Sequence, residues 1–493
     1  MHYGKLQSMT LKVLLALPIR EGNNLQIAPD LGIINLATVL RGHGFEVKLL
    51  DCPKEGFTFR DFKAFLGANL FDVVGFRCYS RDHNYVKHHL KIVRQVLPKA
   101  LTLVGGPHPS ALPEYVLNSM PDLDFAWKAE SEEGLPVLLK LFEAAAKELP
   151  EQRLSTIPGL VWRNRATGAT VVNAPSFGDD LDRYGMPAWD LIRPDTYPGF
   201  IYDEYYPILT TRGCPYPCTY CNTPGLSGKK LRHRSIEQVI EELAFLKQTY
   251  NISRFSIVDD EFTLDSKHAT RFCEQLLQSG LNLRWDCPVG VRLDSLYPEL
   301  LQIMEKAGCE SMAVGIESGS ARMQKLIQKK VTVETIKEQA FMVARCSKIK
   351  IVGYFMLGFL DETEEEILET IDLAVSLPLH RANFNIVIPI PGTGIFEEAL
   401  RAGRISLEKI NWDSYTSDQV SFQRNHLSNE RLVQLHRKAY LRFYGRPNML
   451  WHLANESLSN REIIRASLRN LKRLLRGTPT DSRLPLYIRE AEI

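Results

Sequence analysis

The sequence has no long hydrophobic run, no disulfide framework and no strong excess of charge of either sign. Its 493 residues contain no stretch near the roughly 20 uninterrupted apolar residues of a membrane-spanning helix. With 60 basic and 58 acidic residues the formal net charge is only +2, so we expect no nucleic-acid partner. Nine cysteines are too few and too irregularly spaced for a disulfide-stabilised fold. We therefore expect a reduced, cytoplasmic protein.

The first 150 residues alternate short apolar runs with segments of helical periodicity. A signal peptide would explain the first run, but no small-residue cleavage site follows it, and a buried strand explains it better. Apolar strands separated by helices predict a doubly wound, Rossmann-like α/β domain over residues 1–150, and such sheets bind ligands beyond the carboxyl ends of their strands. The expected strands lie at 12–19, 46–52, 73–80 and 101–106.

The rest of the chain divides into three predicted regions. Residues 151–204 contain a hairpin pattern and then a segment rich in Pro, Gly and Asp, which predicts a linker. Residues 205–400 alternate six strand-like runs with helical segments, the pattern of a (β/α)6 partial TIM barrel. Residues 401–493 are expected to form a helical C-terminal domain.

Three cysteines are crowded into eight residues, as Cys214, Cys218 and Cys221, directly after the first of these strand-like runs. Iron–sulfur clusters are held by cysteine thiolates, normally four for a [4Fe-4S] cluster, so three thiolates without a fourth leave one iron open. The alternative is a structural zinc site completed by His233, although zinc sites generally pair two short motifs and the second is missing.

These residues resemble the signature of the radical S-adenosylmethionine (SAM) superfamily, in which an aromatic residue, here Tyr220, precedes the last cysteine. The resemblance implies that the open iron is chelated by SAM, which is cleaved to a 5′-deoxyadenosyl radical. It also implies SAM contacts at strand ends. Alternatively, the acidic run is a solvated turn and Glu317 caps a helix. The implied SAM contacts are Tyr220, Asp259, Asp260, Glu261, Glu317 and Ser318.

The first domain lacks the glycine motifs of nucleotide-binding sites, but it resembles the cobalamin-binding domain of B12-dependent radical SAM proteins. The turn at 129–134 departs from the family's G-E-G-E at Ala129 and Ser131. The D-x-H-x-x-G motif is missing, which implies base-off cobalamin without a histidine ligand. Simple strand-end packing is the alternative. The candidate cobalamin contacts are Arg77, Tyr79, Ser80, Gly105, Gly106, His108 and Glu130, the first three on its lower side.

Together these resemblances imply a cobalamin-dependent radical SAM methyltransferase acting on an unactivated carbon. A radical cyclase or rearrangement enzyme with the same cofactors, and a non-catalytic cobalamin or cluster sensor, stay open as alternatives. The expected partners are a small-molecule substrate and an external electron donor of the flavodoxin or ferredoxin type. A basic amphipathic segment at 461–477 allows peripheral membrane contact or docking on the barrel, and docking is the more usual role of such helices.

Overall fold

The computed structural model describes residues 10–20, 27–144, 149–197, 205–415, 422–447 and 449. The chain divides into two compact units. The first comprises Met1–Tyr197 with Gly225–Ser227, and the second comprises Pro198–Pro224 with Gly228–Ile493. The predicted domain boundaries stay predictions, and the segment 461–477 lies outside the described residues.

The first unit is built on a seven-stranded sheet with the order β2-β1-β3-β4-β5-β6-β7. Strands β1 to β5 pair in parallel, whereas β6 and β7 are antiparallel, so the hairpin expected in the linker continues this sheet. The chain reverses direction across the sheet between β1 and β3, which is where doubly wound folds bind ligands. The strands are β1 (Lys12–Leu17), β2 (Glu46–Asp51), β3 (Val73–Arg77), β4 (Leu101–Gly105), β5 (Phe125–Trp127), β6 (Leu160–Arg163) and β7 (Thr170–Val172).

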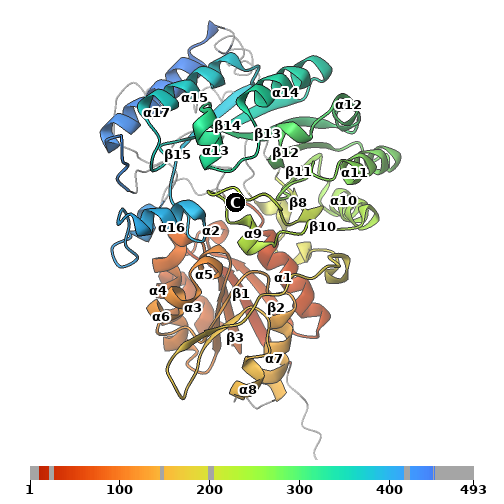
Figure 1. Cartoon of the computed structure of the whole chain (residues 1–493). Helices are drawn as coiled ribbons and strands as arrows, with labels where there is room; N and C mark the ends of the chain where they lie inside the picture. The colour runs from red at the N-terminus through yellow and green to blue at the C-terminus, as the bar shows by residue number, and fades with distance from the viewer. Residues whose placement is uncertain are drawn as a thin grey trace, which may run out of the picture. The chain divides into compact units, whose positions relative to one another are not determined.

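Helices cover both faces of this sheet, which confirms the doubly wound prediction (Figure 1). One face is closed by α3, α4 and α6, whose buried side chains form a single core with β1, β3 and β4. Helix α1 begins where predicted, because the Asp30 side chain accepts the Ile33 N–H at 3.1 Å and caps the helix. The helices are α1 (Leu31–Gly42), α2 (Cys52–Glu55), α3 (Phe59–Ala68), η1 (Ser80–Asp82), α4 (His83–Val96), α5 (Pro107–Ala111), α6 (Pro113–Ser119), α7 (Gly134–Ala144) and α8 (Glu151–Leu154).

The second unit is built on a six-stranded parallel sheet whose order, β15-β14-β13-β12-β11-β8, follows the chain. At least one helix follows each strand before the next strand of the sheet or after the last one, which confirms the partial TIM barrel. The strands are β8 (Pro207–Ile208), β11 (Arg254–Ile257), β12 (Arg284–Val291), β13 (Cys309–Glu317), β14 (Lys350–Leu357) and β15 (Arg381–Ile386). The helices that separate or follow them are α10 (Ile236–Tyr250), α11 (Ser266–Gln278), α12 (Pro298–Lys306), α13 (Ala321–Leu326), α14 (Val333–Cys346), α15 (Glu364–Ser376) and α16 (Gly394–Arg401).

The edge of this sheet is covered by α17 (Asn429–Tyr444), which runs beside β15 (Figure 1). The Tyr440 hydroxyl accepts the Phe384 N–H at 3.1 Å, and the Tyr444 hydroxyl accepts the Ala382 N–H at 3.2 Å and donates to the same residue's carbonyl at 2.9 Å. A helical spacing of four residues therefore matches alternate residues of the strand. No helix within the described ranges is long and apolar enough to cross a membrane.

Candidate active site

The cysteine loop lies beyond the carboxyl end of β8. It leaves the short strand β9 (Thr211–Arg212) through Gly213, which has a φ of 97° and is so close to the carbonyl of Lys230 that a Cβ would overlap it. Cys214 N–H donates to the carbonyl of Gly228 at 3.1 Å, and Cys221 N–H to that of Cys218 at 3.2 Å. These contacts fix the backbone path through the motif.

All three cysteines of the loop are free and partly exposed, whereas Cys52 and Cys78 are buried, as expected for structural thiols. Among the described residues no group of three or more His, Cys, Asp or Glu side chains is assembled to hold a metal ion. The assignment of these three cysteines as the cluster ligands is a proposal. His233 of the zinc alternative instead lies beside Asp265, with Nε2 at 3.2 Å from its carboxylate.

The acidic run after β11 separates into three different environments. Asp259 is fully buried and accepts hydrogen bonds from the Thr210 N–H at 2.6 Å and from the Thr211 hydroxyl at 2.9 Å, so it joins the ends of β8 and β11. Burial raises the pKa of Asp259 to about 6. Asp260 accepts the Gly213 N–H at 2.8 Å and so positions the entry to the cysteine loop.

Glu261 differs from the other two carboxylates because one of its oxygens accepts no hydrogen bond from the described residues. Its side chain is buried, and its Oε1 atom has no hydrogen-bond partner among the described residues. Burial raises the pKa of Glu261 to about 7, while Lys329 and Arg292 oppose this rise. A buried oxygen without a donor is energetically costly unless a ligand supplies one. Glu261 is therefore the best of the three carboxylates to contact a ligand.

Tyr220 and Glu317, both predicted site residues, meet around a lysine that the sequence did not single out. The Tyr220 hydroxyl donates to Glu317 Oε1 at 3.0 Å, and Lys329 Nζ lies 3.0 Å from the same oxygen and 3.1 Å from the Tyr220 hydroxyl. Burial opposes the charge on Lys329, but Glu317 and Cys218 together outweigh burial, and the pKa of the lysine is raised. Lys329 lies between Gln328 and Lys330, which have φ values of 54° and 61°. Such left-handed residues are strained and cluster at functional sites.

Arg292 adds a second cation to the same end of the barrel. Its Nη1 donates to the carbonyl of Lys329 at 2.9 Å, and its guanidinium lies 3.9 Å from the centre of the Tyr216 ring in the cysteine loop. Asp294 accepts two hydrogen bonds from it, at 3.0 and 2.8 Å. The arginine thus ties the segment after β12 to the cysteine loop.

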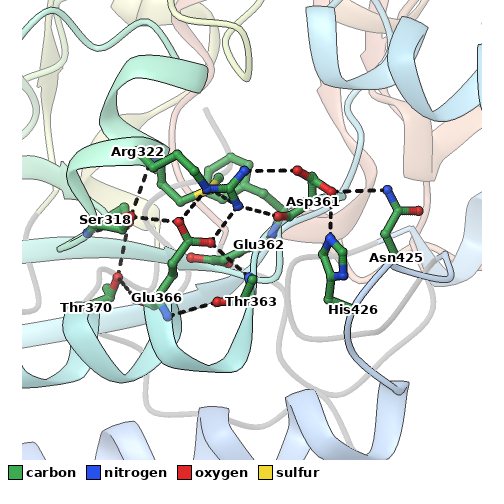
Figure 2. Close-up of polar contacts among 12 residues, drawn as sticks. Ser318, Arg322, Asp361, Glu362, Thr363, Glu366, Thr370, Asn425 and His426 are labelled. Atoms are coloured by element: carbon green, nitrogen blue, oxygen red, sulfur yellow. Dashed lines mark hydrogen bonds and ion pairs between the residues drawn. The ribbon is translucent and has the colours of Figure 1, made fainter.

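Ser318 belongs to a polar network that joins the end of β13 to α15 (Figure 2). The side chain is fully buried, and its hydroxyl lies 3.2 Å from that of Thr370 on α15. In the same network Ser320 and Arg322 donate to Glu366 at 2.9 and 2.8 Å. These bonds hold the turn in which Glu317 has a φ of 65°. The geometry favours a supporting role for Ser318 over direct contact with SAM.

In the first unit the predicted residues gather at the carboxyl ends of β3 and β4. Arg77 Nη1 lies 2.5 Å from Asp30 and its guanidinium 4.0 Å from the centre of the Tyr79 ring, while its buried Nε has no hydrogen-bond partner among the described residues. Gly106 has a φ of 97°, and a Cβ there would lie 3.0 Å from Arg77 Cγ. A side chain on Gly106 would therefore crowd this edge.

The remaining first-unit candidates lie at the end of β4, in α5 and in the turn after β5. Gly105 ends β4, and His108 is buried in α5 with Nδ1 at 3.0 Å from the Ser80 hydroxyl. Ala129 has a φ of 62° where the related turn has glycine, and the Ser110 hydroxyl accepts its N–H at 2.9 Å. Glu130 follows in this turn and is partly exposed.

Comparison with known proteins identifies both units. Residues 208–374 match the Radical SAM superfamily and residues 23–139 match the B12 binding domain. An uncharacterised methyltransferase of Pyrococcus horikoshii is 30% identical over 447 residues, which cover 89% of this chain and 94% of that protein. The chain belongs to the cobalamin-dependent radical SAM family.

Two further comparisons agree with this membership. The cytidylyl-2-hydroxyethylphosphonate methyltransferase of Streptomyces wedmorensis is 28% identical to this radical SAM protein, over 77% of this chain and 79% of its own. The solved structure of the cobalamin-dependent SAM radical enzyme OxsB with aqua-cobalamin bound superposes with a TM-score of 0.72 at 18% identity, over 88% of this chain and 67% of that one. At that identity the likeness shows the shared fold.

Proposed function

We propose that this radical SAM enzyme transfers a methyl group to an unactivated carbon of a small molecule, using a [4Fe-4S] cluster, SAM and base-off cobalamin. The observation that carries the proposal is the pairing of a B12 binding domain and a radical SAM core in one chain. The relative that is 30% identical over 89% of the chain is named a methyltransferase. In such a pairing the cluster and SAM supply radical chemistry, and cobalamin supplies a carrier for the methyl group.

The end of the barrel fits the methionine part of SAM, which carries one ammonium and one carboxylate group. Glu261 presents a buried oxygen without a donor, which suits the ammonium group. Lys329 and Arg292 are the cations that would attract the carboxylate, and Tyr220 and Glu317 hold the lysine in place. The cluster would be held by Cys214, Cys218 and Cys221, whose loop Asp260 fixes through Gly213.

The carboxyl edge of the first sheet fits cobalamin by the same reasoning. The buried Nε–H of Arg77 has no acceptor among the described residues, and an acceptor group of the ligand would satisfy it. Gly106 has no side chain that would obstruct the ligand at this edge. Both ring nitrogens of His108 lie at hydrogen-bond distance from side chains of this unit, so His108 is a poor ligand for cobalt. This supports cobalamin without a histidine ligand.

The proposal also requires an external one-electron donor of the flavodoxin or ferredoxin type. It is tested by anaerobic reconstitution of the protein with iron, sulfide and hydroxocobalamin, followed by incubation with SAM, reductant and a metabolite extract. We expect both S-adenosylhomocysteine and 5′-deoxyadenosine, with a labelled methyl group from SAM in the product. Release of 5′-deoxyadenosine with an unmethylated product would instead identify a cyclase or rearrangement enzyme.

A further inference from the structure

A chain of four polar side chains crosses the first unit beneath the carboxyl ends of β3 and β4. His108 Nδ1 lies 3.0 Å from the Ser80 hydroxyl, and His108 Nε2 lies 3.0 Å from His83 Nδ1. His83 Nε2 in turn lies 3.4 Å from the Ser119 hydroxyl. Both histidines are buried, at 0% and 3% exposure, while Ser80 at the near end and Ser119 at the far end are partly exposed.

The contact between His83 and Ser119 determines which atom donates in each hydrogen bond of this network. Burial lowers the pKa of His83 to about 4 and that of His108 to about 3, so both rings are neutral, and each donates through one nitrogen and accepts through the other. The Ser119 hydroxyl has the carbonyl of Val116 at 3.2 Å, closer than His83 Nε2 at 3.4 Å, and we assign its proton to that carbonyl. The hydroxyl oxygen then accepts from His83 Nε2. His83 Nδ1 is then an acceptor and His108 Nε2 a donor. His108 Nδ1 is left to accept the proton of the Ser80 hydroxyl.

Ser80 lies where doubly wound sheets bind ligands, so the orientation of its hydroxyl decides what a ligand can donate to it. Ser80 begins η1 just after β3, at the edge where the chain reverses direction across the sheet. The turn is fixed by Asp82, which accepts the Tyr79 N–H at 3.1 Å and pairs with Arg20 Nε at 2.6 Å. With its own proton turned toward His108, the Ser80 oxygen has only lone pairs to offer a ligand.

We propose that His83 and His108 are positioning residues that fix the Ser80 hydroxyl as a hydrogen-bond acceptor for a donor group on cobalamin. The donor is a side-chain carboxamide of the corrin or a water on cobalt, which share N–H or O–H chemistry. The proposal rests on the proposed function, because it requires cobalamin at this edge.

The test is a double-mutant cycle on the affinity of the full-length protein for hydroxocobalamin, measured by absorbance titration. Ser80→Ala should weaken binding about tenfold, the loss of one hydrogen bond to the ligand. His108→Phe should weaken it about threefold, because the freed hydroxyl can rotate, and it should have no further effect in the S80A background. Ser155→Ala, an exposed serine of the same unit, is the matched control and should bind as the wild type does.

The outcomes separate the two proposals. Failure of the wild-type protein to bind hydroxocobalamin would overturn the cobalamin part of the proposed function. Wild-type binding together with an unaffected S80A variant, or with additive losses in the double variant, would overturn only the proposed positioning of Ser80 by the two histidines. Should H108F not fold, His108→Asn replaces it, since an amide oxygen can accept the Ser80 proton. H108N should keep the affinity within about twofold, and a tenfold loss would contradict the proposed positioning of Ser80.

A repeat with dicyanocobalamin, which has no water on cobalt, distinguishes the two donors. An equal loss in S80A with both cobalamins identifies a corrin carboxamide. A loss confined to hydroxocobalamin identifies the cobalt-bound water.

Discussion

Replacing Lys329 by methionine breaks the buried ion pair at the proposed SAM site. The side chains of Lys329 and Glu317 are only 11% and 8% exposed, so the change leaves a carboxylate buried without its cation. Breaking such a pair costs about 3–5 kcal/mol. Because Tyr220 still donates to Glu317, we expect about 3 kcal/mol, near the lower limit of that range. For a domain of this size the melting temperature should then fall by about 6–12 °C.

The assay is anaerobic differential scanning calorimetry of the metal-free protein. The control is Lys330→Met, which removes the same charge from the exposed neighbouring position and should leave the melting temperature nearly unchanged. The double variant K329M/E317Q should recover at least half of the loss, because no unpaired carboxylate remains. A K329M shift no larger than that of K330M, or no recovery in the double variant, would refute the buried-pair argument.

Three further changes test other parts of the second unit. Cys214→Ala should abolish stable iron incorporation on reconstitution, measured as iron per chain, while Cys346→Ala, another partly exposed free cysteine, should leave it intact. Glu261→Gln should weaken SAM binding to the reconstituted protein about tenfold to hundredfold by equilibrium dialysis, and unchanged affinity would exclude the glutamate from the site. Burial raises the pKa of Glu362 from 4.5 to about 8, so the stability present below about pH 4.5 is lost as the pH rises toward 8. In Glu362→Gln the melting temperature should fall less between about pH 5 and pH 8 than in the wild type, and parallel curves would contradict the raised pKa.

The strands of the first sheet could be predicted because most are nearly continuous apolar runs, a pattern that a parallel sheet covered on both faces requires. Those of the barrel could be predicted from the regular alternation of strand-like runs with helical segments. The hairpin at 160–172 was also expected from its turn residues. Its pairing with β5 was not, because strand neighbours along the sheet depend on long-range contacts that local sequence does not encode. The cysteine loop was recognisable since all its ligands lie within a single short segment.

The sequence could not rank the carboxylates at 259–261 or identify Lys329. Asp259 is satisfied by the threonines at the end of β8, about 50 residues away, and only the folded sheet brings them together. Lys329 is followed by a second lysine in a loop, a pattern typical of solvated charges. Its burial depends on a turn with left-handed residues on both sides, which neither Gln328 nor Lys330 signals by residue type.

The tyrosines of α17 have a consequence for assembly that is separate from catalysis. A strand at the edge of a sheet is a template on which another chain can add a strand, and closed barrels avoid this by pairing their last strand with their first. In this open barrel two phenol side chains and His436 occupy the backbone groups of β15 that a further strand would use. Side chains on a helix thereby prevent a further strand from pairing with β15. The barrel can stay open at this side because the outward N–H and C=O groups of its edge strand are already hydrogen-bonded.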